Sequence, residues 1–208
     1  MRLINKITIL KYMIKNLLIV ALLAVAVNTY AQQTAPMKKS AQVGAYGTFS
    51  TGFTSVSGHL SVITGVSGGI FLNKKFMIGA GGYTMANMIK INKTGIDRNW
   101  HIWYTGGVFE YVHHSDKKFH WTAGTLIGGG SLSERLVMED EKDKDKVVDR
   151  YGFFVVEPFI NAELNINQHI RLFAAGKYRQ IMGAGSGGLS NGGMSAPGLY
   201  VGIKAGRF

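Results

Sequence analysis

Apolar and polar side chains alternate with a period of two along most of the chain, a pattern that predicts β-strands. We predict eight strands, near residues 41–53, 59–72, 75–85, 99–113, 119–130, 150–164, 169–182 and 198–208. Most exceed the roughly 5–6 residues of an ordinary strand and reach the roughly 9–11 residues that cross a bilayer at a tilt.

The connections between these strands are of two kinds. Short turns are expected at residues 73–74, 115–118 and 166–168, with a modest connection at 54–58. Long loops are expected at residues 86–98, 131–149 and 183–197. Short turns at one end and long loops at the other are typical of outer-membrane barrels, whose turns face the periplasm and whose loops face the outside.

The first 31 residues predict a cleaved secretory signal peptide. Four basic residues precede an apolar run at 17–27, which is shorter than the about 20 residues of a membrane-spanning helix. Cleavage is expected after Ala31, and either Met1 or Met13 is the initiator. Residues 32–40 then form a short polar segment before a barrel domain at 41–208.

Composition excludes several classes of protein. The chain has no cysteine, so it holds no disulfide, cysteine-ligated metal or acylated-cysteine anchor. Its 28 glycines disfavour a helix bundle. The signal peptide holds 4 of the 23 basic residues and none of the 12 acidic ones, which leaves a formal net charge of +7 on the mature chain. These charges form no basic stripe, so we expect no nucleic-acid binding.

The two faces of the predicted strands differ in polarity. In strand 169–182, Leu172 and Ala174 share one face, and Arg171 and Lys177 share the other. A soluble barrel turns the apolar face inward, whereas a membrane barrel turns it to lipid. Periodicity alone does not choose between them, but signal peptide, strand length and loop asymmetry together favour the membrane barrel.

The membrane arrangement predicts a charged lumen. A turn centred on Asn167 would set Glu163 opposite Arg171 and Glu157 opposite Lys177, two pairs of opposite charge on the polar face. The full predicted lumen network is Glu110, Glu157, Glu163, Arg171, Lys177, Arg179 and Lys204. Because side chains just fill an eight-stranded barrel, we predict a plugged core rather than an open pore.

With its signal peptide, eight-strand rhythm and closing strand 198–208, the chain resembles the small eight-stranded outer-membrane barrels of Gram-negative bacteria, the OmpA/OmpX-like type. The resemblance implies an all-β, antiparallel up-and-down transmembrane barrel at the cell surface, with no catalytic motif and no cofactor. It also implies that the terminal aromatic, here Phe208, is recognised by the barrel-assembly machinery.

Two residues depart from that pattern. Phe208 shares the parity of Lys204 rather than that of the apolar face, so either a bulge near Gly206 corrects the phase or the chain end leaves the sheet. Pro158 interrupts a strand of a barrel that has no edge, and we expect a local bulge there.

Aromatic residues concentrate near the ends of the predicted strands, where membrane barrels carry interface girdles. The predicted interface residues are Phe53, Trp100, Trp103, Tyr111, Phe119 and Trp121. Packing inside a soluble barrel is the competing interpretation.

Three motifs could indicate catalysis, nucleotide binding or metal binding. His113 and Ser115, with Glu110 nearby, resemble the residue types of outer-membrane lipid A deacylases, but a predicted periplasmic turn is the wrong side for lipid A. The G-x-G-x-x-G match at 183–188 lacks its strand–turn–helix context. The acidic run at 139–146 lacks the central glycine of a calcium loop, and its lysines neutralise the acids. We therefore expect no metal site.

The sequence thus predicts a non-enzymatic outer-membrane barrel with a structural or surface-interaction role through its long loops. Its expected partners are outer-membrane lipids, the assembly machinery and an unknown extracellular ligand at the loops. The alternatives are a lipid-modifying hydrolase, a soluble periplasmic lipocalin-like carrier and, more weakly, a pore.

Overall fold

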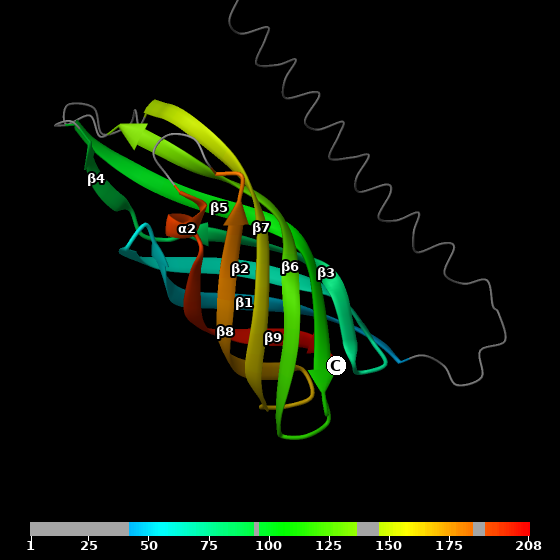
Figure 1. Cartoon of the computed structure of the whole chain (residues 1–208). Coiled ribbons are helices and arrows are strands. Elements are labelled where there is room, and N and C mark those ends of the chain that lie inside the picture. The colour runs from blue at the N-terminus through cyan, green and yellow to red at the C-terminus, as the bar shows by residue number, and fades with distance from the viewer. Residues whose placement is uncertain (1–41, 94–95, 137–145, 185–189) are drawn as a thin grey trace, which may run out of the picture. The chain divides into compact units, whose positions relative to one another are not determined.

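The computed structural model describes residues 42–93, 96–136, 146–184 and 190–208. Within these ranges the chain forms nine strands and one short helix (Figure 1). Their bounds are β1 Val43–Val56, β2 His59–Leu72, β3 Phe76–Met85, β4 Ile89–Lys93, β5 Ile96–His113, β6 Phe119–Leu136, β7 Lys146–Asn165, β8 Ile170–Met182, α2 Asn191–Met194 and β9 Ala196–Arg207. Among the described residues, no helix is long and apolar enough to cross a membrane.

Eight of these strands close into a barrel in which each neighbouring pair is antiparallel. Strands that follow one another in the chain lie side by side, and β9 returns to β1, as where Gly52 pairs with Tyr200. β4 stands outside this circle, because β3 pairs directly with β5 and β4 forms a hairpin on β5. The predicted fold class, an eight-stranded up-and-down barrel, is confirmed, and β4 occupies part of the predicted loop at 86–98.

Strands at the loop end run further than predicted. The predicted loop at 131–149 is wrong over much of its length, since β6 continues to Leu136 and β7 starts at Lys146. The cause is that the alternation of residue types stops at Ser131 while the backbone pairing continues, with one register shift at Glu134. The barrel wall therefore extends well beyond the length that patterning alone suggests.

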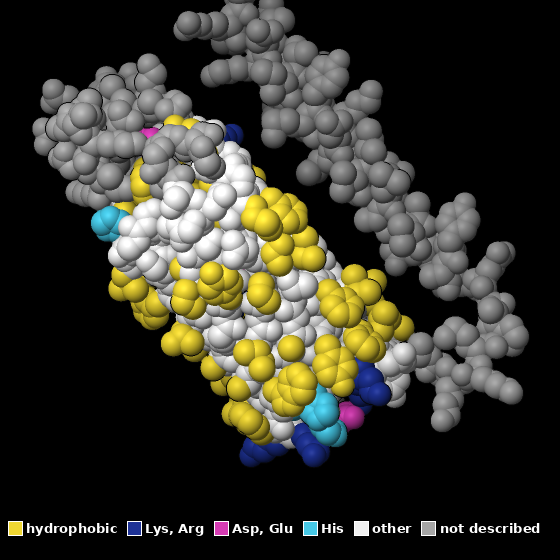
Figure 2. All heavy atoms as spheres, in the orientation of Figure 1, with side chains coloured by type: hydrophobic (Ala, Val, Ile, Leu, Met, Phe, Trp, Pro, Cys, Tyr) yellow, Lys and Arg dark blue, Asp and Glu magenta, His cyan; other side chains and the backbone are white. Residues whose placement is uncertain are grey.

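The outer surface of the barrel is apolar, whereas its interior holds charged side chains beside apolar ones. Phe53, Phe119 and Leu199 are 61%, 68% and 74% exposed, whereas Glu157 and Arg179 are each 1% exposed. Figure 2 shows hydrophobic side chains spread over the visible face of the barrel. A soluble protein buries apolar groups and exposes charges, so this arrangement is reversed and is typical of a barrel in lipid.

Glycines make room for aromatic rings inside the narrow barrel. The ring of Phe173 lies against Gly202 of the next strand, and the ring of Tyr200 lies against Gly52, so that a Cβ at either glycine would collide with the ring and with backbone. Glycine in a strand often marks such a close approach. These pairs explain part of the high glycine content.

The short turns gather at one end of the barrel, which we call the turn end. Asn73 and Lys74 have φ of 52° and 55°, as a type I′ hairpin requires. Lys74 Nζ reaches Asp116 Oδ1 of the next turn at 2.7 Å. Phe208 lies at the same end, where its ring packs 5.1 Å from that of Tyr46.

The β7–β8 register corrects the predicted pairing. Glu163 pairs with Phe173 and Asn165 with Arg171, two residues away from the prediction. The turn is therefore centred on Gln168, one residue later in the chain than predicted. A shift of two residues keeps every side chain on its original face, so the charges still meet diagonally.

The expected bulge at Pro158 is wrong. Pro158 pairs with Thr125 of β6 without a register shift, and the β7–β8 register is the same at Val156 and at Phe159. The proline, which has no N–H to donate, leaves a local gap in the β8 pairing instead of an extra residue.

Phe208 follows the second of its two predicted alternatives. β9 keeps one register with β1 and with β8 along its length, without a bulge near Gly206, and it ends at Arg207. Phe208 lies beyond the strand, and its ring contacts the inward-facing rings of Tyr46 and Phe71.

Candidate functional site

The most elaborate chemistry in the described residues lies inside the barrel, where four strands contribute a cluster of charges. The Lys204 amine on β9 contacts the carboxylates of Glu110 on β5 and Glu163 on β7, the latter at 2.5 Å. All three side chains are at most 3% exposed. Two buried carboxylates thus share one buried cation, which offsets part of the cost of burying each charge alone.

Neutral groups satisfy the remaining lone pairs of these carboxylates. The Tyr46 hydroxyl donates to Glu110 Oε2 at 2.6 Å, and Asn161 Nδ2 donates to Glu110 Oε1 at 3.3 Å. Thr122 Oγ1 donates to Glu163 Oε1 at 3.1 Å. Because the hydrogen-bonding capacity of the carboxylates is largely used within the protein, the cluster is a rigid core rather than an open anionic site.

His120 and Arg171 extend the cluster towards the turn end. His120 Nε2 lies 3.2 Å from Glu163 Oε2, and Nδ1 lies 3.2 Å from the Lys117 carbonyl oxygen. Both ring nitrogens therefore lie near oxygen atoms, and Nε2 also lies 3.4 Å from Arg171 Nη1. Arg171 Nη1 lies 3.7 Å from Glu163, and Nη2 donates to Ser115 Oγ at 2.8 Å.

The ring of Phe208 packs at this end of the lumen. The guanidinium carbon of Arg171 lies 3.6 Å from the centre of that ring, within the range of a cation–π contact. The last residue of the chain is therefore tied to the interior charges and to the two rings beneath it.

A second cluster lies nearer the loop end. The Lys177 amine donates to Tyr83 Oη at 3.0 Å and to Glu157 Oε1 at 3.4 Å. The Tyr104 hydroxyl donates to the other oxygen of Glu157 at 2.5 Å. The rings of Tyr83 and Tyr200 lie 4.2 and 4.5 Å from the amine, so aromatic faces surround the charge.

Arg179 holds α2 over the loop end of the lumen. Its Nε donates to the Met194 carbonyl oxygen at 3.0 Å, and its Nη2 donates to the Ser55 carbonyl oxygen at 2.8 Å. Met194 is fully buried, and the Ser57 amide donates to the Gly193 carbonyl oxygen at 2.6 Å. The short helix is thus fastened to β8 and to the β1–β2 turn, and it covers the barrel.

The space left between the two charge clusters is small. A cavity of about 20 Å³ lies between them, lined by residues that include Glu110, Glu157, Lys177 and Lys204. A volume of that size accommodates about one water molecule, whereas ligand pockets span about 300–1,000 Å³.

The structure places all seven residues of the predicted lumen network inside the barrel, in separate groups. Glu110, Glu163, Arg171 and Lys204 lie together near the turn end, Glu157 and Lys177 lie further up, and Arg179 contacts α2. The predicted network did not include His120 or the two tyrosines that donate to glutamates. Alternation could have identified His120, because it lies two residues from the buried Thr122 on β6 and therefore on the same inward face.

Five of the six predicted interface aromatics lie on the outer surface or are partly exposed, and Trp100 does not. Trp100 is 7% exposed and belongs to the interior apolar cluster. It shares the parity of the inward-facing Ile102 and Tyr104, and that parity outweighs its position near a strand end. Trp103 and Trp121, by contrast, are 41% and 42% exposed.

The residue types of a deacylase are present but they are not assembled. His113 stacks on Trp121 at the outer surface, with ring centres 4.9 Å apart. Ser115 is 5% exposed and its hydroxyl accepts from Arg171, while Glu110 binds Lys204 inside the lumen. Within the described ranges, no group of three or more acidic, histidine or cysteine side chains is arranged to hold a metal ion.

Several sequence predictions fall partly or wholly outside the described residues. They are the signal peptide at 1–31, the segment at 32–40, most of the acidic run at 139–146 and part of the glycine-rich stretch at 183–188.

No protein-family model matches the sequence, and no curated protein is similar to it in sequence. Among solved structures, Neisserial surface protein A superposes with a TM-score of 0.58 at 12% identity, over 82% of this chain and 100% of that one. The N-terminal β-barrel domain of OprF from Pseudomonas aeruginosa gives a TM-score of 0.49 at 9% identity, over 80% and 99%. Ail of Yersinia pestis, in complex with the heparin analogue sucrose octasulfate, gives 0.49 at 8% identity, over 82% and 100%.

At such identities a structural likeness concerns the fold alone. The superposition on Neisserial surface protein A, which spans the whole of that chain, confirms at the level of fold the resemblance to small eight-stranded outer-membrane barrels.

Proposed function

We propose that this protein is a non-enzymatic outer-membrane barrel with a structural or surface-interaction role through the connections at its loop end. The sequence predicted these connections at 86–98, 131–149 and 183–197, and β4 and the longer β6 and β7 occupy part of the first two ranges. Export by the predicted signal peptide would bring it to that membrane. The observation that carries the proposal is the apolar outer surface, on which large side chains such as Phe53 and Leu199 are more than 60% exposed. Soluble proteins rarely expose an apolar surface of this extent to water, whereas the acyl chains of lipids solvate it.

The length of the loop-end strands supports a role outside the membrane. β5, β6 and β7 have 18, 18 and 20 residues. At a rise of about 3.3 Å per residue and a tilt of about 45°, they would stand about 42–47 Å tall. The hydrocarbon band of such barrels is about 25 Å tall, so these strands would project beyond it and carry the loops with them.

The filled interior disfavours a carrier and a pore. A lipocalin-like carrier needs a cavity for its ligand, and the space between the charge clusters holds about one water molecule. A pore needs a continuous channel, but the space between the charge clusters is about 20 Å³, and Phe208 and α2 pack against Arg171 and Arg179 on either side of it. We therefore expect neither ligand storage nor steady conductance in a planar bilayer.

The arrangement of polar groups also disfavours a hydrolase. A nucleophile needs a base within hydrogen-bond reach. The hydroxyl of Ser115 faces Arg171, and His113 packs on Trp121 on the opposite face of the wall. If extracted protein released acyl chains from lipopolysaccharide, and if Ser115→Ala abolished that release, the non-enzymatic assignment would fail.

For Phe208 we propose a role in assembly before the barrel closes. The ring packs inside the folded barrel, so the assembly machinery would recognise it in the unfolded chain. Phe208→Ala should lower the amount of protein in the outer membrane while refolding into detergent micelles still succeeds. Equal outer-membrane amounts for Phe208→Ala and the unsubstituted protein would contradict the role.

Cysteine labelling tests both the location and the orientation, because the chain has no cysteine of its own. Gly192→Cys places a thiol on exposed α2, and Lys117→Cys places one on an exposed residue of the turn end. On intact cells, a membrane-impermeant maleimide should label the cysteine at 192 but not the one at 117. Both should react after lysis, in material that pellets with outer membrane.

Two outcomes would overturn the proposal. Protein in the periplasmic extract would indicate a soluble carrier, and labelling at position 117 on intact cells would reverse the orientation. A folded barrel should also migrate differently on a gel before and after boiling.

A further inference from the structure

The turn end of the barrel carries a concentration of cations. Two lysines lie at the β2–β3 turn, two at the β5–β6 turn, and an arginine ends β9. This turn-end collar consists of Lys74, Lys75, Lys117, Lys118 and Arg207. Figure 2 shows Lys and Arg side chains gathered at one end of the visible face, below the hydrophobic side chains.

Acidic side chains offset little of this charge. Asp116, in the same turn as Lys117, pairs with Lys74 at 2.7 Å. Within the described part of the chain, Lys75, Lys117, Lys118 and Arg207 form no ion pair. Repulsion by the neighbouring His113 lowers the pKa of the exposed His114, so His114 adds little positive charge. The collar therefore presents about four uncompensated cations to its surroundings.

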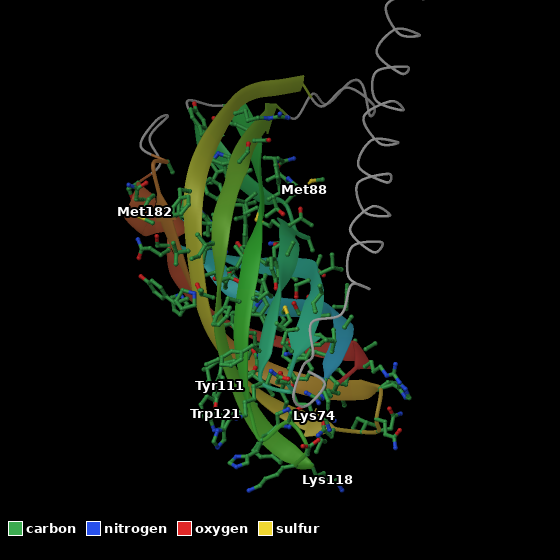
Figure 3. The ribbon with its side chains drawn as sticks, turned by 90° about the vertical axis from the view of Figure 1, so that its right-hand side faces the viewer. Lys74, Met88, Tyr111, Lys118, Trp121 and Met182 are labelled. Atoms are coloured by element: carbon green, nitrogen blue, oxygen red, sulfur yellow. The ribbon has the colours of Figure 1, made fainter. Side chains whose placement is uncertain are left out.

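Aromatic side chains stand directly beside these cations. Lys75 and Lys118 are each followed by an exposed phenylalanine, Phe76 and Phe119. Tyr111 and Trp121 lie above and to the left of Lys118 in Figure 3, and their ring centres are 6.0 Å apart. Tryptophan and tyrosine in membrane proteins sit at the level of the lipid headgroups. The neighbouring amines, on flexible stems that extend towards water, would lie at the depth of the headgroup phosphates.

We propose that the turn-end collar binds the headgroups of anionic phospholipids in the leaflet that surrounds it. This inference rests on the proposed membrane location and adds a lipid class to it. Charge complementarity selects the occupant, because zwitterionic headgroups offer the collar no net negative charge. Clusters of lysines and arginines beside a membrane attract anionic lipids in this way.

The three tryptophans of the chain provide a local test. The double variant Trp100→Phe/Trp103→Phe keeps Trp121 as the reporter beside the collar. A second double variant, Trp100→Phe/Trp121→Phe, keeps Trp103, which is about equally exposed but lies in the loop-end half of β5, whereas Trp121 lies near the turn-end start of β6. Each is reconstituted in phosphatidylethanolamine bilayers that contain a fixed fraction of brominated phosphatidylglycerol or brominated phosphatidylethanolamine.

Bromine quenches the fluorescence of a tryptophan that touches the lipid. At Trp121 we expect brominated phosphatidylglycerol to bind about fivefold more tightly than brominated phosphatidylethanolamine, and at Trp103 we expect no preference. The variant Lys75→Gln/Lys117→Gln/Lys118→Gln should remove the preference at Trp121. Arg150→Gln, an exposed cation at the loop end of β7, should leave it unchanged.

The possible failures are distinguishable. Quenching of neither reporter by either lipid would contradict the membrane location itself. Equal quenching by both lipids at Trp121, or a preference that survives the triple substitution, would overturn the collar alone. Loss of the preference on adding inorganic phosphate, but not chloride of equal ionic strength, would assign the collar to soluble anions and would also overturn the proposal.

Discussion

The charge cluster near the turn end depends on Lys204, because its amine contacts two carboxylates from different strands. In Lys204→Met, Glu110 and Glu163 would face each other without their shared cation. Removing one partner from a buried ion pair costs about 3–5 kcal/mol, and we expect a loss of that size in the free energy of unfolding. Denaturant titration of the barrel in lipid vesicles, followed by tryptophan fluorescence, measures it.

A second substitution separates the charge effect from the change in packing. Adding Glu110→Gln to Lys204→Met removes one of the two unpaired carboxylates, so the double variant should be more stable than the single one. Arg150→Met, at an exposed cation, serves as the control. A loss below about 1 kcal/mol for Lys204→Met, the range of a surface pair, would contradict a buried role.

Glycine has opposite effects at two positions of the wall. In Gly202→Ala the new methyl group would collide with the ring of Phe173 and with backbone, so we expect destabilisation by about 1–3 kcal/mol. In Gly176→Ala the nearest atom, on Ile160, lies 3.9 Å away, and the substitution should be neutral or slightly stabilising. The same denaturant titration compares the two, and equal effects would exclude the packing explanation.

Alternation of residue types gives the facing of a side chain but not its partners. Arg171 and Lys177 share one parity on β8, and both lie inside. That Lys204 bridges β5 and β7 depends on barrel curvature, which no local pattern encodes. Where two local signals disagree, as at Trp100, the inward parity prevails over the nearness of a strand end.

At the scale of elements, the number and order of the barrel strands could be predicted, while their ends and one register could not. The β7–β8 turn was misplaced by one residue, because the asparagine that suggests its centre instead accepts hydrogen bonds with its side chain from the amides of His169 and Ile170. β4 was missed because its alternation of isoleucines with polar residues covers only five residues. The upper part of β6 was missed because consecutive residues from Ser131 to Glu134 are all buried, so that one face is not distinguished from the other.

The position of α2 depends on a single side chain of β8. In Arg179→Met the carbonyl oxygens of Met194 and Ser55 would lose their guanidinium donors, so α2 should detach more often from the lumen. We expect hydrogen exchange at the amides of residues 193–195 to accelerate about tenfold, as loss of about 1.4 kcal/mol of local stability implies. Exchange within β1 and β9 should be unchanged.

Tyr178→Phe is the matched control for that experiment, because Tyr178 neighbours Arg179 on β8 but faces outward and is 45% exposed. If α2 exchanged equally fast in the two variants, Arg179 would not be what fastens it. Planar-bilayer recordings of Arg179→Met give a second readout, since a detached α2 would leave the loop end of the lumen less covered.

At the scale of the whole molecule, the proposed membrane location requires that the apolar outer surface of the barrel faces lipid rather than water. Val201, in the middle of β9, and Val43, at the turn-end start of β1, are 59% and 60% exposed on the outer surface. In water, an arginine at either position would be solvated and nearly harmless. In lipid, the cost of an outward arginine depends on depth, about 2–4 kcal/mol at the midplane and about 0–1 kcal/mol near an interface.

Val201→Arg should therefore lower the free energy of unfolding in vesicles by about 2–4 kcal/mol, and Val43→Arg by less than about 1 kcal/mol. Equal exposure of the two valines makes the comparison one of depth alone. Equal, small effects at both positions would mean that water surrounds the apolar outer surface. The barrel would then be soluble, and the proposed membrane location would be wrong. A large cost at Val201 alone would mean that acyl chains surround the middle of the barrel, which is the condition under which its buried charges make structural sense.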